Sequence, residues 1–275
     1  MQNTLHSLAA THYENFPVGS RLIPARYREA IHLIYAFART ADDLADEGGM
    51  DTAERLTRLA DWRQKLHDAV EGKPADSFFT ALAAAIHRHG LSLQLFDDLL
   101  TAFRMDAADP VFSTFEEVLQ YCAYSANPIG RLLLQIFKCS NENTVRFSDS
   151  ICTALQLTNF WQDISVDTGR NRFYIPQEDL NTFGVHHDIL RSRESSEEFR
   201  LMLRMQWERT RQLFLDGKPI FTLVAKEFRL ELKLIWHGGM RILEKIEALN
   251  FDTRTVRPSL KPVDSLIILF RAIRA

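Results

Sequence analysis

Four carboxylates stand within the six residues 42–47, DDLADE. Asp42 and Asp46 are one helical turn apart, so they share a face of a helix. Like charges at this spacing repel, and acidic groups in the last turn of a helix oppose its macrodipole. The stability of the helix therefore does not explain the pattern. Carboxylates one turn apart do suit the binding of Mg²⁺ together with a phosphorylated ligand. A solvated acidic helix end is the alternative interpretation.

A second set of oxygen ligands, Asn159, Asp163 and Asp167, recurs at steps of four residues. This spacing predicts one stripe along a helix. Because Trp161 and other apolar neighbours fall off the stripe, we expect them to seat the helix in the core and the stripe to face a polar cavity. Two facing carboxylate clusters with metal ions suit the ionisation of an allylic or cyclopropylcarbinyl diphosphate, since the metals neutralise the leaving group.

Hydroxyl and cationic side chains flank both acidic segments. Tyr35 and Arg39 precede the first segment, and Arg170, Arg172 and Tyr174 follow the second. Guanidinium groups pair well with phosphate oxygens, so these residues are candidates for binding a diphosphate. A surface salt bridge for Arg39 and an ordinary buried tyrosine for Tyr35 are the alternatives.

Helices must position these residues, because apolar residues recur along the chain at three and four rather than at two. We expect an all-α chain with one domain over residues 1–275, no linker, and an irregular stretch at about 170–195. Capping pairs are predicted at Asp51 with Glu54, Ser113 with Glu116, and Ser195 with Glu198. The predicted helices run from Pro24 to Gly48-Gly49, from Asp51 to Val70, and over about 77–90, 92–106, 114–138, 145–168, 196–215, 220–249 and 258–273.

The composition restricts partners and compartment. A net charge of −3 provides no global positive field, so no nucleic-acid partner is expected. Three cysteines without paired spacing argue against a disulfide framework and a zinc site. The N-terminus has no signal-peptide pattern, and no apolar run approaches the length of about 18 residues needed to span a membrane. A reduced, cytoplasmic setting fits best.

Several other patterns are expected to be structural. Asp97-Asp98 lacks a third carboxylate one turn later, and the histidines at 87, 89, 186 and 187 lack metal-ligand spacing. Gly238-Gly239 lacks the strand, turn and helix context of a phosphate loop. No dinucleotide fingerprint occurs, so NADPH is not expected as a cofactor.

The segments DDLADE and NFWQDISVD resemble the aspartate-rich motifs of the squalene/phytoene synthase family, and the resemblance covers nearly the whole chain. It implies an isoprenoid synthase-type helical bundle in which two or three Mg²⁺ ions bind a prenyl diphosphate in a central cavity. The resemblance implies metal binding by Asp42, Asp46, Asn159, Asp163 and Asp167, diphosphate binding by Tyr35, Arg39, Gln156, Arg170, Arg172 and Tyr174, and a catalytic cavity tyrosine at Tyr124.

Departures from the general motifs indicate a subgroup. SANPIG replaces the usual residues at 125–130, Gln162 stands in the place of a common arginine, and Asn15-Phe16-Pro17 replaces a serine-phenylalanine pair. These features are similar to the hydroxysqualene synthases of bacterial hopanoid biosynthesis. The similarity implies that presqualene diphosphate and water give hydroxysqualene and diphosphate, with the water held near Tyr124 and Asn127.

Some alternatives stay open at this point. One is squalene or phytoene synthesis from two prenyl diphosphates, and another is a noncatalytic helical assembly protein, although that would predict eroded carboxylates. The segment at 261–275 is expected to pack on the core, with peripheral contact to the inner membrane surface as the alternative. Contact with the enzyme that supplies presqualene diphosphate also stays open.

Overall fold

The computed structural model describes residues 22–46, 49–170, 172–192, 194 and 196–274 of the chain. Every regular element in these residues is a helix, which confirms the expected all-α class. None of the helices described is both long enough and apolar enough to cross a membrane. The cysteines are free thiols rather than disulfides.

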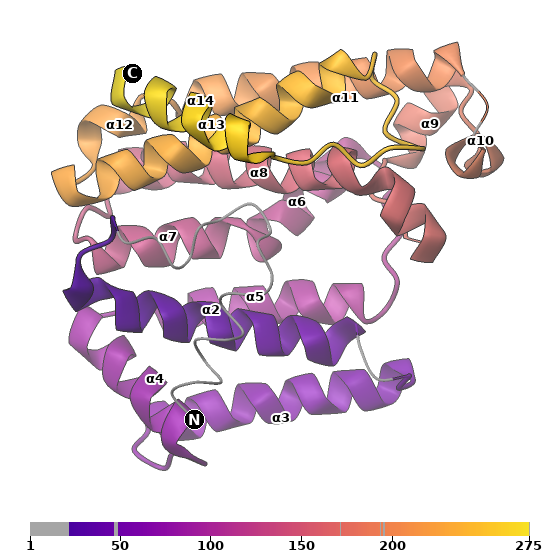
Figure 1. Ribbon diagram of the computed structural model, residues 1–275. Helices are drawn as coiled ribbons and strands as arrows, with labels where there is room; N and C mark the ends of the chain where they lie inside the picture. The colour runs from indigo at the N-terminus through magenta and orange to yellow at the C-terminus, as the bar shows by residue number, and fades with distance from the viewer. Residues whose placement is uncertain (1–21, 47–48, 171, 193, 195, 275) are drawn as a thin grey trace.

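The helices follow one another in two stacked halves (Figure 1). The lower half of that view contains α2 to α5, the upper half contains α8, α11, α13 and α14, and α6 and α7 lie between. Their bounds are α2 Ala25–Asp46, α3 Thr52–Val70, α4 Ser77–His89, α5 Leu93–Asp106, α6 Phe115–Ser125, α7 Asn127–Ile136, α8 Glu142–Asp167, the 3₁₀ turn η1 Thr168–Arg170, α9 Gln177–Phe183, α10 His187–Arg191, α11 Glu197–Gly217, α12 Ile220–Leu223, α13 Lys226–Ala248 and α14 Pro262–Arg274.

Helix α2 carries the first acidic segment at its C-terminal end. Its apolar face is buried, with Phe37 packed edge-on against Phe96 of α5 at 5.3 Å between ring centroids. At the other end of α2, Arg26 forms a 2.6 Å ion pair with Glu227 of α13. These contacts fix the rotation of α2 about its axis. Tyr35, Arg39 and Asp42 therefore face α8 across a cavity.

Helix α8 carries the second acidic segment and forms the centre of the upper half. Trp161 is fully buried, and its indole nitrogen donates a 2.8 Å hydrogen bond to Thr210 of α11. Gly239 lets α13 approach closely, because a Cβ there would lie 2.8 Å from Leu155. Gln162 donates a 2.7 Å hydrogen bond to the carbonyl of Pro258. Contacts on several sides therefore hold the polar stripe of α8 in one direction.

Two predicted long helices are interrupted in the structure. The helix expected over 114–138 is two helices, α6 and α7, because Pro128 stands in the first turn of α7, where a proline is tolerated. The helix expected over 220–249 is divided into α12 and α13 at Val224, whose backbone is extended. The stretch at 170–195, predicted to be irregular, contains α9 and α10.

Several helix starts differ from the prediction by a few residues. Helix α8 begins at Glu142 rather than near 145, since Asn141 forms a capping box with Thr144. The cap of α6 is Thr114 rather than Ser113, and its hydroxyl accepts a 3.3 Å hydrogen bond from the amide of Glu117.

The starts of α3 and α11 and the end of α2 lie close to their predicted positions. The predicted cap at Asp51 is confirmed by a 2.8 Å hydrogen bond from the amide of Glu54. Ser196 caps α11, whereas Ser195 lies outside the described residues. Gly48 also lies outside them, and α2 ends at Asp46.

Asp97 connects two helices rather than forming a metal site. Its carboxylate accepts hydrogen bonds from Arg63 at 2.8 Å and from His67 at 2.9 Å, which ties α5 to α3. Asp98 accepts a 2.8 Å hydrogen bond from Gln94 on its own helix. The structural role expected for this acidic pair is therefore supported.

Candidate active site

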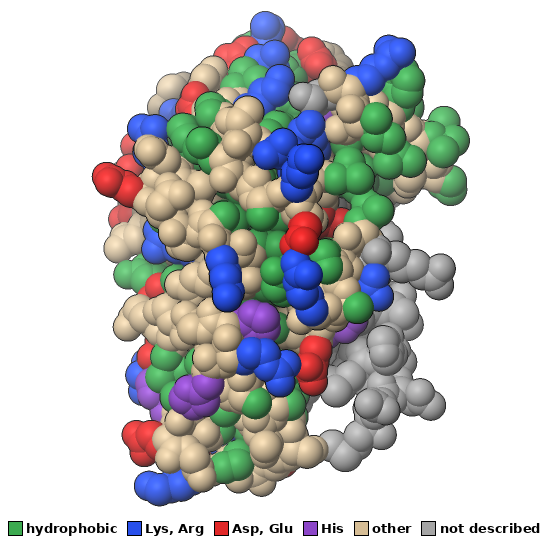
Figure 2. Space-filling view, turned by 90° about the vertical axis from the view of Figure 1, so that its left-hand side faces the viewer, with side chains coloured by type: hydrophobic (Ala, Val, Ile, Leu, Met, Phe, Trp, Pro, Cys, Tyr) green, Lys and Arg blue, Asp and Glu red, His purple; other side chains and the backbone are tan. Residues whose placement is uncertain are grey.

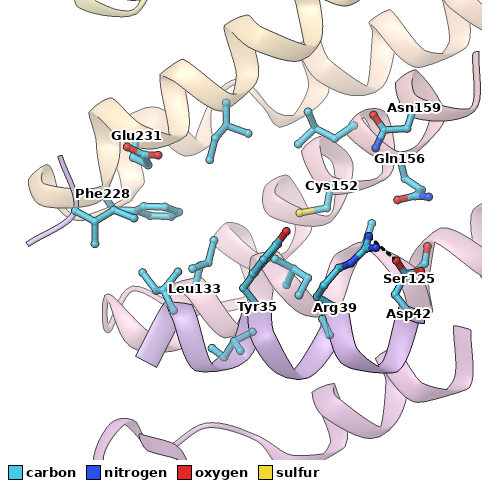
Figure 3. A pocket seen from close by; sticks show the side chains of 18 of the residues that line it. Tyr35, Arg39, Asp42, Ser125, Leu133, Cys152, Gln156, Asn159, Phe228 and Glu231 are labelled. Atoms are coloured by element: carbon cyan, nitrogen blue, oxygen red, sulfur yellow. Dashed lines mark hydrogen bonds and ion pairs between the residues drawn. The ribbon is translucent and has the colours of Figure 1, made fainter. Parts of the chain in front are cut away.

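A cavity of about 310 Å³ lies between α2, the α6–α7 junction, α8 and α13 (Figure 3). The polar side chains that line it are Tyr35, Arg39, Asp42, Ser125, Gln156, Asn159 and Glu231. The apolar lining includes Ile31, Ile34, Phe103, Ile129, Leu133, Phe137, Leu155, Phe228 and Ile235. The cavity thus combines a polar region with a long apolar wall.

Along α2 the cavity changes from polar to apolar, although Glu231 of α13 lies beside Phe228 at the apolar end (Figure 3). Ile31 and Asp42 both line it and are 11 positions apart in the sequence, which corresponds to a rise of about 16 Å along a helix. Around Asp42 the opposite wall is Gln156 and Asn159 of α8 (Figure 3). The other end is lined by aromatic rings, with Phe228 stacked on Phe137 at 4.5 Å between centroids.

The first acidic cluster is partly neutralised by a neighbouring cation. Arg39 forms ion pairs with Asp42 at 3.1 Å and with Asp43 at 2.7 Å. Burial raises the pKa of Asp42 to about 6, and repulsion from Asp46 adds to the shift, while Arg39 opposes it. The site therefore holds more negative charge than Arg39 balances.

The second acidic cluster, Asp163 and Asp167, is also paired with a cation. Burial raises the pKa of Asp167 to about 7, with further repulsion from Asp163. Arg257, from the segment that follows α13, donates hydrogen bonds to Asp163. Sequence reasoning missed Arg257, because it stands 94 positions from its partner and belongs to no motif.

Arg172 joins the two acidic clusters. Its guanidinium donates a 2.8 Å hydrogen bond to the carboxylate of Asp46, and both side chains are largely buried. The same guanidinium lowers the pKa of Asp42 and of Asp167 against the effect of burial. Arg172 therefore lies between the two acidic segments, bonded to the first and acting electrostatically on the second.

Sequence reasoning also missed a buried carboxylate, Asp106, at the end of α5. The hydroxyl of Tyr121 donates a 2.8 Å hydrogen bond to it, and burial raises the pKa of Asp106 to about 7 with further repulsion from Asp46. A signal existed, since Asp106 is an acidic residue in the last turn of a helix, where it opposes the macrodipole. The ring of Tyr174 lies beside that of Tyr121 and stacks on Phe160 at 3.9 Å between centroids.

Arg170, Tyr124 and Asn127, the other residues predicted for the site, lie in different parts of the structure. Arg170 ends η1 and acts on Asp167 electrostatically. The residues of the α6–α7 junction that line the cavity are Ser125 and Ala126, rather than Tyr124 or Asn127. Asn127 is buried and accepts a 3.1 Å hydrogen bond from Thr153. The segment at 15–17 lies outside the described residues.

Comparison with known proteins assigns the family. A model of the squalene/phytoene synthase family matches residues 9–264. The chain belongs to the squalene/phytoene synthase family. It is 34% identical to the hydroxysqualene synthase of Rhodopseudomonas palustris over 263 residues, which are 94% of this chain and 88% of the relative.

A second hydroxysqualene synthase and a solved structure are similar to this chain at about the same sequence identity. The hydroxysqualene synthase of Sinorhizobium fredii is 35% identical over 262 residues, 94% of this chain and 87% of the relative. The crystal structure of squalene synthase HpnC from Alicyclobacillus acidocaldarius matches with a TM-score of 0.84 at 35% identity, covering 91% of this chain and 94% of that one.

The donor set of this squalene/phytoene synthase family member fits a hydrated cation bridged to a ligand. In the part of the chain that the structure describes, no three carboxylate, imidazole or thiolate groups converge on one point. Mg²⁺ does not need such a cage, because one or two carboxylates, several waters and substrate phosphates complete its octahedron. Burial, and after it repulsion from a neighbouring carboxylate, raises the pKa of Asp42 and of Asp167, and a divalent cation would stabilise the charged form of both groups.

Proposed function

We propose that this chain converts presqualene diphosphate and water to hydroxysqualene and diphosphate. The observation that carries the proposal is one cavity that has Arg39 and Asp42 at its polar end and a long apolar wall that includes aromatic rings. The similarity to two hydroxysqualene synthases supports the choice of reaction.

Binding of the diphosphate is assigned to the polar end. Arg39 lines the cavity, and Arg172 lies between the acidic clusters, so both guanidinium groups can donate paired hydrogen bonds to phosphate oxygens. Gln156 and Asn159 add amide donors from α8. Mg²⁺, held by Asp42, Asp46, Asn159, Asp163 and Asp167, would supply the positive charge that stabilises the departing diphosphate.

The apolar wall protects the cation that forms when the carbon–oxygen bond breaks and its electron pair leaves with the diphosphate. Aliphatic side chains exclude bulk water, and the faces of Phe103, Phe137 and Phe228 attract positive charge. The cyclopropylcarbinyl cation then rearranges. Water forms the new carbon–oxygen bond and loses a proton, which leaves the neutral alcohol.

The assignment is tested by supplying substrates separately to the purified chain with Mg²⁺. Presqualene diphosphate should give hydroxysqualene whether or not NADPH is added, and farnesyl diphosphate alone should give no C30 product. Squalene or phytoene formed from the simple prenyl diphosphates would instead support the head-to-head condensation. Absence of turnover with every diphosphate would support the noncatalytic alternative.

A further inference from the structure

Arginines form ion pairs with most of the carboxylates that the proposed function assigns to metal binding. The pairs are Asp42 with Arg39, Asp46 with Arg172 and Asp163 with Arg257. A guanidinium and Mg²⁺ carry charge of the same sign, so they compete for a carboxylate. Binding of the metal at these aspartates therefore weakens their bonds to the arginines.

Arg257 covers the second acidic cluster, although it belongs to neither acidic motif. Its Nε donates a hydrogen bond to one carboxylate oxygen of Asp163, and its Nη2 donates one to the other oxygen at 3.2 Å. The same guanidinium favours the charged form of Asp167 and so lowers the pKa of that group against the effect of burial. Arg257 therefore acts on both carboxylates of the cluster.

The backbone on both sides of Arg257 is fixed to α8. The hydroxyl of Thr253 donates a 2.7 Å hydrogen bond to the carbonyl of Trp161, and the carbonyl of Pro258 accepts one of 2.7 Å from Gln162. The side chain of Arg257 is nevertheless 36% exposed. Rotation of this side chain can therefore change the partner of the guanidinium without a movement of the segment that carries it.

A second arginine has the same arrangement at the first acidic segment. Arg172 is bonded to Asp46 and also acts electrostatically on Asp167, so Arg172 and Arg257 both lie near the second cluster. Paired donors of this kind match the oxygens of a diphosphate. Figure 2 shows the opposite end of the bundle, where α2 and α13 begin, and there the basic side chains are spread among apolar and uncharged ones.

We propose that Arg257 is a further diphosphate-binding residue, which pairs with Asp163 until Mg²⁺ binds that carboxylate and then donates its hydrogen bonds to the diphosphate. Mg²⁺ repels the guanidinium from Asp163, and the diphosphate attracts it, so the two ligands bind cooperatively. The inference rests on the metal and diphosphate site of the proposed function, but not on how the reaction ends.

The test titrates the full chain by calorimetry with Mg²⁺ alone, with inorganic diphosphate alone, and with diphosphate at saturating Mg²⁺. Arg257→Gln should bind Mg²⁺ alone about three- to tenfold more tightly, because the competing cation is removed. At saturating Mg²⁺ the same variant should bind diphosphate at least about tenfold more weakly, because the paired donors are lost. Arg257→Lys should bind diphosphate with an intermediate affinity, since it keeps the charge alone.

Arg131→Gln is the matched control. Arg131 pairs with Asp149 of α8 at 2.6 Å, and the two side chains are 35% and 21% exposed, compared with 36% and 22% for Arg257 and Asp163. This control should bind both ligands as the unmodified chain does. Mg²⁺ and diphosphate also associate in solution, but that association is the same for every variant and does not affect the comparison.

The two opposite changes expected of Arg257→Gln separate an exchange of partners from a merely structural ion pair. The inference is overturned if this variant binds Mg²⁺ no more tightly than the unmodified chain, or if it binds diphosphate at saturating Mg²⁺ equally well. An unmodified chain that binds neither ligand would overturn the metal and diphosphate site and this inference with it. Binding as expected without formation of hydroxysqualene would support the inference and contradict only the proposed reaction.

Discussion

Arg172 donates a 2.8 Å hydrogen bond to Asp46, although 126 positions separate the two residues in the sequence. The contact brings the end of α2 to the end of α8. It also places a fixed guanidinium between two groups of carboxylates, where a diphosphate and its cations would bind. The guanidinium at this point should therefore matter for the reaction more than for folding.

Replacing Arg172 by Lys should lower the turnover number by about ten- to a hundredfold, because lysine keeps the charge but loses the planar pair of donors. The matched control is Arg63→Lys, which alters the ion pair between Arg63 of α3 and Asp97 of α5. Steady-state kinetics on both variants measures the effect. A raised KM with unchanged turnover would mean that Arg172 only binds the ground state.

Asp163→Asn should abolish turnover and leave the helix content and melting temperature nearly unchanged. The lost ion pair with Arg257 is partly exposed, and the substitution also relieves the repulsion between Asp163 and Asp167. Mg²⁺ should raise the melting temperature of the unmodified chain and of the control Asp98→Asn, but raise that of Asp163→Asn less. Full activity in Asp163→Asn, or an equal Mg²⁺ effect in all three proteins, would exclude this metal site.

The adjacent glycines of α13 should respond to alanine in opposite directions. A Cβ on Gly239 would lie 2.4 Å from Phe214, so Gly239→Ala should lower the free energy of unfolding by about 1–2 kcal/mol. Nothing lies within 4 Å of a Cβ on Gly238, so Gly238→Ala should raise it by about 0.5–1 kcal/mol. Urea denaturation measures both, and equal effects would contradict the packing described for α13.

His237 should make the protein less stable in acid. Burial lowers the pKa of its ring to about 4, and the nearby Arg271 and Lys218 add to the effect. In the unfolded chain the ring binds a proton near pH 6.5, so its contribution is fully present above that pH and is lost as the pH falls toward 4.

Through His237, the free energy of unfolding should fall by about 1–2 kcal/mol between roughly pH 7.5 and pH 5. His237→Gln should therefore lose less stability than the unmodified chain over this range, in denaturant titrations at the two pH values. The exposed His87→Gln serves as the control and should follow the unmodified chain. An identical pH dependence for His237→Gln would contradict the burial argument.

The sequence predicts the faces of helices better than the contacts between them. Spacing was sufficient to place Asp42 with Asp46 and Asn159 with Asp163, because helical geometry alone decides which side chains share a face. Spacing could not reveal Arg257 or Asp106, whose positions depend on how distant helices pack. The break at Pro128 was detectable from the residue type, since proline in the middle of a helix removes a hydrogen bond.

The central claim is that water ends the reaction, and an isotope measurement tests it most directly. The purified chain is incubated with presqualene diphosphate and Mg²⁺ in H₂¹⁸O without NADPH, and the product is analysed by mass spectrometry. The account predicts an alcohol that carries one ¹⁸O atom per molecule. Squalene as the main product, formed only when NADPH is added and without labelled alcohol, would contradict it.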